Sequence, residues 1–308
     1  MNVKNDAMPA LLYDHPIVCF GEILWDVFPG GSLPGGAPLN VAYHLRKMGT
    51  YPILISRFGL DEAGEKLINL VDGYGIGTDH FQLDPEWPTG KVIATEQKDH
   101  EMLYDILQPV AWDAIQWEEG FQKVVSQAPY FVFGSLVTRS LVSRNTLYRL
   151  LESAPRRVLD ANLRSPYYNR EILEKLLTGL HLLKLNLAEL ELITGWFSPY
   201  KSETDRIQIL QDRFHIPSIV VTKGSKGAVF QVEGVIYEHP GFEAQVVDTV
   251  GSGDAFLAAL LTRLLAGAPP GNALTFANAA GALVAGRMGA CPSYDAEDIH
   301  QIAASTVK

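Results

Sequence analysis

Short apolar segments alternate with helical patterns along most of the chain, and this alternation constrains the fold more than any other feature. Six segments rich in β-branched and aromatic residues are typical of strands: 16–28, 51–59, 130–135, 157–162, 181–186 and 218–224. Four segments between them carry apolar residues three and four positions apart, as amphipathic helices do: 37–49, 141–153, 169–180 and 202–214. The alternation predicts an α/β fold built from βα units, with a mostly parallel central sheet and helices on both faces.

The alternation breaks at about residues 89–107, where two half-polar strands follow one another with a charged turn between them. This pattern predicts a β-hairpin that projects from the main sheet, with the segment at about 24–36 beside it. A hairpin with one polar face is either a small β lid over a cleft or an ordinary surface hairpin. The chain has no internal repeat and no dividing linker, so we expect residues 1–308 to form a single domain.

Composition excludes several classes of protein. The net charge of −10 argues against nucleic acid or an anionic membrane as a partner. Cys19 and Cys291 are the only cysteines and form no CxxC pair, which argues against a disulfide framework or a zinc site. The N-terminus lacks a signal-peptide core, and no uncharged stretch reaches the roughly 18 residues of a membrane span. We therefore expect a cytoplasmic protein.

The segment DTVGSGDAF, residues 248–256, places two glycines and a carboxylate directly before a helical apolar run. Gly251 and Gly253 leave backbone N–H groups uncovered, and the following helix adds its own unsatisfied N–H groups and the positive end of its dipole. Such a loop can hold a phosphate. Asp254 then either caps the helix or accepts a proton from a hydroxyl that attacks the phosphate. No GxxxxGK[ST] P-loop is present, and Phe256 replaces the third glycine of a dinucleotide fingerprint.

A second group of polar residues lies near the N-terminus, in GEILWDVFPGGSLPGGAPLNVAYHLRKMG. Asp26 follows an apolar strand, and the pair Gly35–Gly36 lets a ligand approach the backbone closely. Asn40 lies inside the next predicted helix. Asp and Asn side chains bind hydroxyl groups, so this segment indicates a ligand with many hydroxyls, such as a sugar.

Four motifs, in order, resemble the ribokinase or PfkB family of carbohydrate kinases. PGGAPLNVA is similar to the family's N-terminal glycine–asparagine signature, and DTVGSGDAF is similar to its DTxGAGD signature, with Ser252 where Ala is usual. NLAE at 186–189 is similar to the NxxE element, and TKGSKG at 222–227 to the TxGxxG turn. The order and spacing hold from about residue 17 to 294. The resemblance implies a ribokinase-like fold and an ATP-dependent sugar kinase.

The resemblance also implies roles for individual residues. Asp254 would be the general base toward the primary hydroxyl of the sugar, and the amides of Gly251, Ser252 and Gly253 would hold the transferring phosphoryl group. These backbone donors together with magnesium would be sufficient, because phosphoryl transfer needs mainly positioning and charge stabilisation. The implied sugar-binding residues are Asp26, Gly35, Gly36, Asn40, Tyr104, Arg164 and Asp254.

The implied ATP-binding residues are Asn186, Glu189, Thr222, Lys223, Gly224, Gly227 and Asn278. Glu189 would act on Mg²⁺ through water, because this ion keeps much of its hydration shell; the alternative is a solvated helix acid. Asn278 lies either beside the adenine or on a helix face as an ordinary polar residue. Asp248, the carbonyl of Val250 and Ser293 would hold a monovalent cation such as K⁺. Alternatively, Asp248 only bonds backbone amides of its loop.

The sugar is indicated by three segments. LDANLR, which ends at Arg164, and FGSLVTRS resemble fructokinases and 2-keto-3-deoxygluconate kinases, which often read DPNxR where Ala161 replaces the proline here. Arg164 faces the sugar or the phosphate with its planar fork of donors, or forms a surface salt bridge. Tyr104 on the expected lid strand would lie against the sugar ring. GEILWDVFPGGSLPGGAP is closer to bacterial fructokinases than to ribokinases.

We therefore expect ATP-dependent phosphorylation of D-fructose at its 6-hydroxyl, which yields fructose 6-phosphate. The alternative is a 2-keto-3-deoxygluconate kinase or another PfkB sugar kinase. The alternative class is a sugar-binding regulatory protein without turnover, which the intact Asp254 and its glycine loop argue against. Relatives often dimerise through the lid strands, so the resemblance also implies a homodimer.

Overall fold

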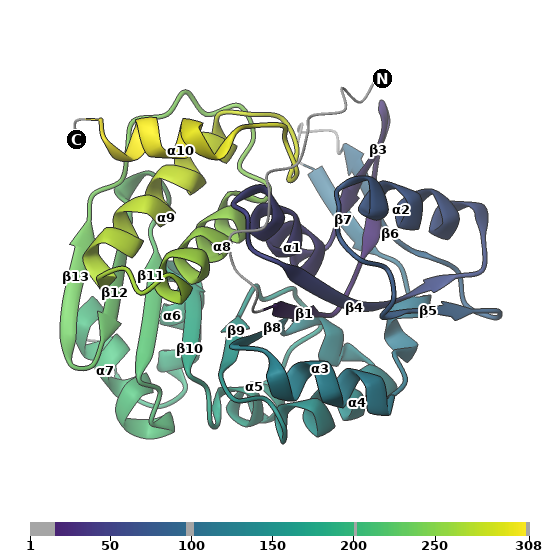
Figure 1. The fold of residues 1–308 in the computed structure, drawn as a ribbon. Helices are drawn as coiled ribbons and strands as arrows, with labels where there is room; N and C mark the ends of the chain where they lie inside the picture. Colours follow the sequence, from purple (N-terminus) through teal and green to yellow (C-terminus); the bar gives the residue numbers. More distant parts are fainter. Residues whose placement is uncertain (1–15, 97–101, 200–201, 306–308) are drawn as a thin grey trace.

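A nine-stranded sheet between two layers of helices forms the body of the molecule, with a smaller four-stranded sheet at one side (Figure 1). The computed structural model describes residues 16–96, 102–199 and 202–305. The order of the large sheet is β13-β12-β11-β10-β9-β8-β1-β4-β5, and the seven strands from β11 to β5 are parallel. The strands are β1 Ile17–Phe20, β4 Pro52–Gly59, β5 Phe81–Asp84, β8 Tyr130–Gly134, β9 Arg157–Asp160, β10 Leu182–Asn186, β11 Ser218–Thr222, β12 Ala228–Val232 and β13 Val235–His239.

The predicted mostly parallel sheet is confirmed, with two differences from the sequence pattern. The segment 16–28 is two strands rather than one, because Gly21 adopts φ 144° and turns the chain out of the large sheet after Phe20. Asp26 consequently lies within a strand of the small sheet rather than after a strand. β12 and β13 form an antiparallel hairpin that the sequence analysis did not predict.

The small sheet has the order β3-β2-β6-β7. Its strands are β2 Leu24–Phe28, β3 Gly31–Gly35, β6 Gly90–Glu96 and β7 Met102–Ile106. The hairpin expected at about 89–107 corresponds to β6 and β7, and its turn at 97–101 lies outside the described residues. The segment at about 24–36 joins it, because β2 pairs in parallel with β6.

Helices cover both faces of the large sheet, as predicted. Alternate residues of β1 enter two separate cores: Ile17 and Cys19 face one side, and Val18 and Phe20 face the other. The first core is covered by α1 Ala37–Lys47, α2 Glu62–Gly73, α8 Ser252–Leu265, α9 Pro270–Ala285 and α10 Ala296–Ala303. The second is covered by α3 Glu119–Gln127, α4 Leu141–Leu151, α5 Arg170–Leu177, α6 Leu187–Gly195 and α7 Glu203–Phe214.

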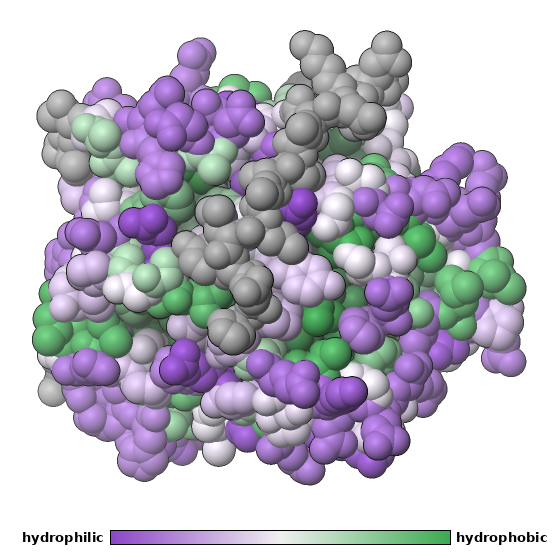
Figure 2. Space-filling model, in the orientation of Figure 1, coloured by the Kyte–Doolittle hydropathy of each residue, from purple (hydrophilic) through white to green (hydrophobic). Residues whose placement is uncertain are grey.

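The outer surface of the helices is mostly polar. Hydrophilic side chains cover the lower edge of the molecule in Figure 2, where α3, α4 and α5 lie. Within the described ranges, none of the helices is both long enough and apolar enough to cross a bilayer.

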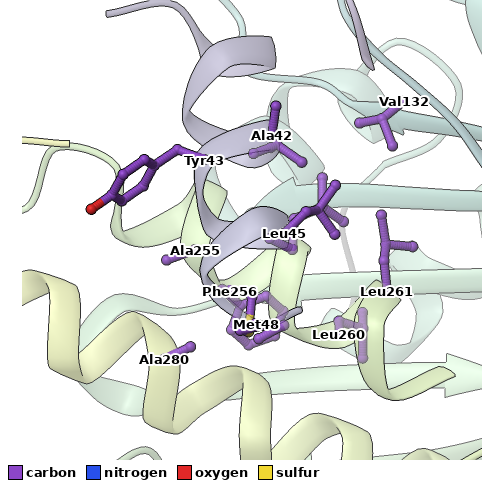
Figure 3. Close-up of a cluster of buried hydrophobic side chains, with 14 of the residues drawn as sticks. Ala42, Tyr43, Leu45, Met48, Val132, Ala255, Phe256, Leu260, Leu261 and Ala280 are labelled. Atoms are coloured by element: carbon purple, nitrogen blue, oxygen red, sulfur yellow. The ribbon is translucent and has the colours of Figure 1, made fainter. Parts of the chain in front are cut away.

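Helix α1 packs against α8 although more than 200 residues separate them in sequence (Figure 3). Leu45 of α1 and Met48, its C-cap, meet Phe256 and Leu260 of α8 in the first core. All four side chains are 5% exposed or less, so the two helices are held by apolar burial. This packing fixes the N-terminal ends of α1 and α8 relative to each other, and these ends carry the polar residues of both signatures.

Candidate active site

A cleft of about 920 Å³ lies where the small sheet faces the carboxyl ends of β9 and β10 and the loop before α8. Ligands of open α/β sheets bind at this edge. The predicted site residues that line the cleft are Asp26, Gly36, Asn40, Tyr104, Arg164, Asn186, Val250, Gly251, Gly253 and Asp254. The remaining predicted residues lie outside its lining: Gly35, Ser252, Glu189, Thr222, Lys223, Gly224, Gly227, Asn278, Asp248 and Ser293.

Asp254 does not cap helix α8. The helix begins at Ser252, its N-cap is Gly251 with φ 77°, and no side chain makes a capping hydrogen bond. Asp254 is the third helical residue, and its Oδ2 accepts a hydrogen bond of 2.8 Å from Nδ2 of Asn40. The two signatures therefore meet at a buried carboxylate–amide pair in the cleft.

Backbone N–H groups at the start of α8 lie close to Asp254 in the chain. The N–H groups of Gly251 and Gly253 make no hydrogen bond to any described residue, so they remain available to an anion. Ser252 differs, because its N–H donates to the carbonyl of Thr249 at 3.3 Å. A Cβ at position 251 would lie 2.6 Å from the Cα of Ala290, so both the space and the positive φ require glycine there.

The pKa of Asp254 is raised to about 6 by burial and by the nearby charge of Asp160. Lys184, Asn40 and Arg164 oppose this shift but do not cancel it. A general base works best when its pKa lies near the pH of operation. The environment of Asp254 therefore suits proton abstraction near neutral pH better than that of an exposed aspartate.

Asp160 and Lys184 form a buried ion pair beside Asp254 that the sequence analysis missed. Nζ of Lys184 lies 2.9 and 2.8 Å from the two carboxylate oxygens of Asp160, its directly paired residue on β9. Lys184 lines the cleft, and its Nζ lies 3.0 Å from where a Cβ on Gly253 would stand. Burial lowers the pKa of Lys184, but the carboxylates of Asp160 and Asp254 raise it above its usual value. A lysine inside the apolar strand HLLKLN was the available signal.

Gly35 and Gly36 lack side chains where other residues of this chain approach their backbone closely. A Cβ on Gly35 would lie 2.2 Å from Oδ2 of Asp26, and one on Gly36 would lie 2.3 Å from the carbonyl oxygen of Glu22. Burial raises the pKa of Asp26 to about 6, against the opposing charge of Arg164. Glu22 is a second residue that the sequence analysis missed, although an acid in the apolar run CFGEILW was a visible signal.

Arg164 and Tyr104 face the cleft from opposite sides. Arg164 is exposed and makes no ion pair with a described residue, so within this part of the chain it does not form the alternative surface salt bridge. Its charge instead offsets part of the rise that burial causes in the pKa values of Glu22, Asp26 and Asp254. Tyr104 on β7 is 54% exposed, which leaves its ring free to meet a ligand.

Asn186 and Glu189 form a reciprocal capping box at the start of α6. Oδ1 of Asn186 accepts from the N–H of Glu189 at 2.9 Å, and Oε2 of Glu189 accepts from the N–H of Asn186 at 2.8 Å. Oε1 of Glu189 accepts from the N–H of Leu163 at 2.8 Å. Glu189 is 8% exposed, so the alternative of a solvated helix acid is wrong. Its carboxylate also holds the loop that carries Arg164.

The TxGxxG segment is a tight turn after β11. Its Lys223 N–H donates to the carbonyl of Gly227 at 2.7 Å, and Nζ of Lys223 lies 3.2 Å from Glu203. Gly227 has φ 77°, and a Cβ there would lie 1.9 Å from the carbonyl oxygen of His239. Thr222 donates to the carbonyl of Leu185 at 3.3 Å. Gly224 also has a positive φ, 57°.

Asn278 and Asp248 both bond the backbone. Asn278 is buried on α9, and its Nδ2 donates to the carbonyl of Leu274 at 2.8 Å, as the helix-face alternative expects. Asp248 accepts from the N–H of Val250 and the N–H of Gly289, each at 3.0 Å, which is the loop-bonding alternative. Ser293 is exposed, and its carbonyl accepts from Arg287.

Comparison with known proteins shows the family and the fold of this chain. The sequence pattern of the pfkB family carbohydrate kinases matches residues 14–297, and the chain belongs to this family. A probable fructokinase, fructokinase-7, from Arabidopsis thaliana is 28% identical over 331 residues, which cover 97% of this chain and 95% of the relative.

Two solved structures share the fold to the same degree. A double mutant of the fructokinase from Vibrio cholerae O395, in its fructose-, ADP- and potassium-bound form, has a TM-score of 0.80 at 22% identity, covering 94% of this chain and 98% of that chain. A ribokinase from Arabidopsis thaliana, complexed with ribose and ATP, also has a TM-score of 0.80 at 22% identity, covering 96% of this chain and 100% of that chain. The ribokinase-like α/β fold is therefore confirmed. Because the fructose-bound and the ribose-bound structure match equally well, the fold does not indicate which sugar this chain binds.

Proposed function

We propose that this protein is an ATP-dependent sugar kinase in which Asp254 takes the proton from the acceptor's primary hydroxyl. The observation that carries the proposal is the position of Asp254. Its carboxylate is buried, bonded to Asn40, and beside the uncovered amides of Gly251 and Gly253 at a helix N-terminus. An attacking hydroxyl bound at Asp254 would thus stand next to the place where phosphoryl charge is stabilised.

The nucleotide would bind beside β10 and β11, where the capping box of Asn186 and Glu189 and the Thr222–Gly227 turn shape the backbone. A magnesium ion bound with ATP would neutralise charge on the transferring phosphate. Oxygen ligands and retained water are what this ion prefers, and Glu189 presents a buried carboxylate that suits a water-mediated contact. Asn278, whose amide nitrogen is already used within α9, is a weaker candidate for an adenine contact.

The acceptor end of the cleft favours a neutral polyol. Four carboxyl groups line the acceptor end of the cleft, those of Glu22, Asp26, Asp105 and Asp254. Arg164 also lines the cleft and makes no ion pair with a described residue, whereas Lys184 is paired with Asp160. Carboxylates accept hydrogen bonds from hydroxyls but repel an anionic substrate. This charge balance supports D-fructose, phosphorylated at its 6-hydroxyl, over 2-keto-3-deoxygluconate, and the fructokinase names among the relatives agree with it.

ADP release measured with fructose, ribose, 2-keto-3-deoxygluconate, glucose, tagatose and adenosine tests the proposal. We expect fructose to give the highest kcat/KM. A preference of tenfold or more for the keto acid, about 1.4 kcal/mol of transition-state binding, would overturn the choice of sugar and make Arg164 its carboxylate partner. Binding without turnover for every sugar would instead identify a regulatory protein.

We also propose a potassium site behind the anion loop, at Asp248 and the carbonyl of Val250, with Ser293 as a further ligand. The backbone bonds of Asp248 hold this loop in place, and the potassium-bound form of the Vibrio relative supports the proposal. At fixed magnesium, we expect potassium to raise the rate above that in sodium. Equal rates in potassium, sodium and tetramethylammonium would contradict it. The single domain of residues 1–308, the cytoplasmic location and the homodimer stay predictions.

A further inference from the structure

Glu22 is a buried acid in the cleft that the proposed reaction does not use. It lies in the bend between β1 and β2, is 2% exposed, and lines the cleft together with Asp26 and Asp254. Its Oε2 is buried without a hydrogen-bond partner among the described residues. Burial raises the pKa of Glu22 to about 7, although backbone N–H groups and the charge of Arg164 favour its ionised form.

Support of helix α1 accounts for only part of this side chain. The N-cap of α1, Gly36, has no side chain to cap the helix, and the backbone N–H groups of Glu22 itself and of Ala37 favour the ionised form of the Glu22 carboxylate. A structural role of this kind needs one carboxylate oxygen. The second oxygen is desolvated without a donor among the described residues, which is unfavourable unless a ligand supplies one.

The position of Glu22 indicates which ligand that is. Glu22, Arg164 and Asp254 all line this cleft, and the charges of Arg164 and Asp254 both act on the pKa of Glu22. The carbonyl of Glu22 also contacts Gly36, four residues before the Asn40 that bonds Asp254. A molecule whose hydroxyl lies at Asp254 would therefore extend past Glu22.

We propose that Glu22 is a further acceptor-binding residue. Its Oε2 takes a hydrogen bond from a sugar hydroxyl other than the one at Asp254, and this bond selects for acceptors that carry that hydroxyl. The inference rests on the proposed sugar-kinase function. Glu22 transfers no proton in the reaction; it contributes to binding and specificity.

The test uses Glu22→Gln and Glu22→Met. Gln retains one oxygen for the N–H of Ala37 but replaces the free oxygen with an amide NH₂ group, whereas Met retains the length without any acceptor. Glu65→Gln, at an exposed acid on α2, is the control. KM for the best sugar of the panel, KM for ATP and Tm are measured for all four proteins, and the sugar's monodeoxy analogues are compared with the parent sugar.

We expect both Glu22 variants to raise the sugar KM at least tenfold while ATP KM stays within twofold, and Glu65→Gln to change neither. One monodeoxy analogue should lose at least tenfold in kcat/KM with the wild type and much less with Glu22→Met. Sugar KM within twofold of the wild type in both variants, or an equal rise in sugar KM and ATP KM, would overturn the inference. A wild type that turns over none of the sugars would overturn the proposed function itself.

Discussion

The two ends of the cleft use their polar residues in opposite ways. At the acceptor end, the side chains themselves face the cleft: Asp26 and Glu22 are half or fully buried acids, and Asp254 is held by a single side-chain bond to Asn40. At the nucleotide end, motif residues mainly bond or fit against the backbone. Both oxygens of Glu189 accept from backbone amides, and Gly227 fits a space that admits no side chain.

This difference indicates a chemical role for the side chains at the acceptor end of the cleft and a structural role for those at the nucleotide end. Burial raises the pKa of Glu22, Asp26 and Asp254 at the acceptor end and also that of Glu189 at the nucleotide end. Of these four acids, Glu189 is the one whose two carboxylate oxygens both accept backbone hydrogen bonds, and the acids of the acceptor end lack this double support. Removing such a charge should change function without loosening the fold. Residues at the nucleotide end satisfy backbone groups or avoid clashes, so changing them should disturb the fold first and nucleotide binding as a consequence.

The largest effect is expected for Asp254→Asn at the acceptor end. Asn keeps the shape and can still accept from Asn40, but it cannot take a proton. Loss of a general base typically lowers the rate by about 10²–10⁴. Because burial disfavours the charged form of Asp254, Tm at pH 7 should not fall. We expect kcat to fall by this factor while sugar Kd changes much less. A near-normal kcat in this variant would show that Asp254 is not the general base.

At the nucleotide end, Gly227→Ala should lower stability. The new Cβ would meet the carbonyl of His239, in addition to the strain of a positive φ, and such strain costs of order 1–3 kcal/mol. Gly234→Ala is the matched control, because Gly234 has φ 78° with nothing within 4 Å of its Cβ position. Urea unfolding should show a larger loss for position 227 than for position 234. Equal losses at the two positions would mean that the turn tolerates the side chain.

Glu189→Gln should have a smaller effect of the same kind. Gln has a single side-chain oxygen, so either the N–H of Leu163 or that of Asn186 loses its partner. An unsatisfied buried group of this type costs about 1–3 kcal/mol. We expect a lower Tm together with a higher ATP KM, and no change in the exposed control Glu191→Gln on the same helix. A rise in sugar KM with unchanged ATP KM would contradict the division of the cleft.

Much of this arrangement could be predicted from the sequence. The βα alternation predicted the parallel sheet, and the two signatures predicted that Asn40 and Asp254 belong to one site, which their hydrogen bond now joins. The break of segment 16–28 was missed because apolar residues predominate on both sides of Gly21 and Glu22, although the two halves enter different sheets.

Residues outside the motifs were harder to find. The Lys184–Asp160 pair depends on the register of β9 and β10, and the free oxygen of Glu22 depends on a bend and a helix start brought together by folding. Sequence patterns report which residues are buried, but they do not report which buried acid lacks a partner. Only the packed structure distinguishes a buried acid that has a hydrogen-bond partner from one that lacks it.

The pH dependence of kcat/KM tests the central claim most directly. Asp254 must be ionised to accept a proton, and its pKa is raised from 3.8 to about 6. The rate should therefore be constant above this pKa and fall about tenfold per unit well below it. Glu22 and Asp26 titrate nearby, so the profile is repeated in Glu22→Gln and Asp26→Asn. We predict an inflection near pH 6 that persists in both variants. A flat profile from pH 5 to 8, or an inflection that disappears in Asp26→Asn, would contradict Asp254 as the base.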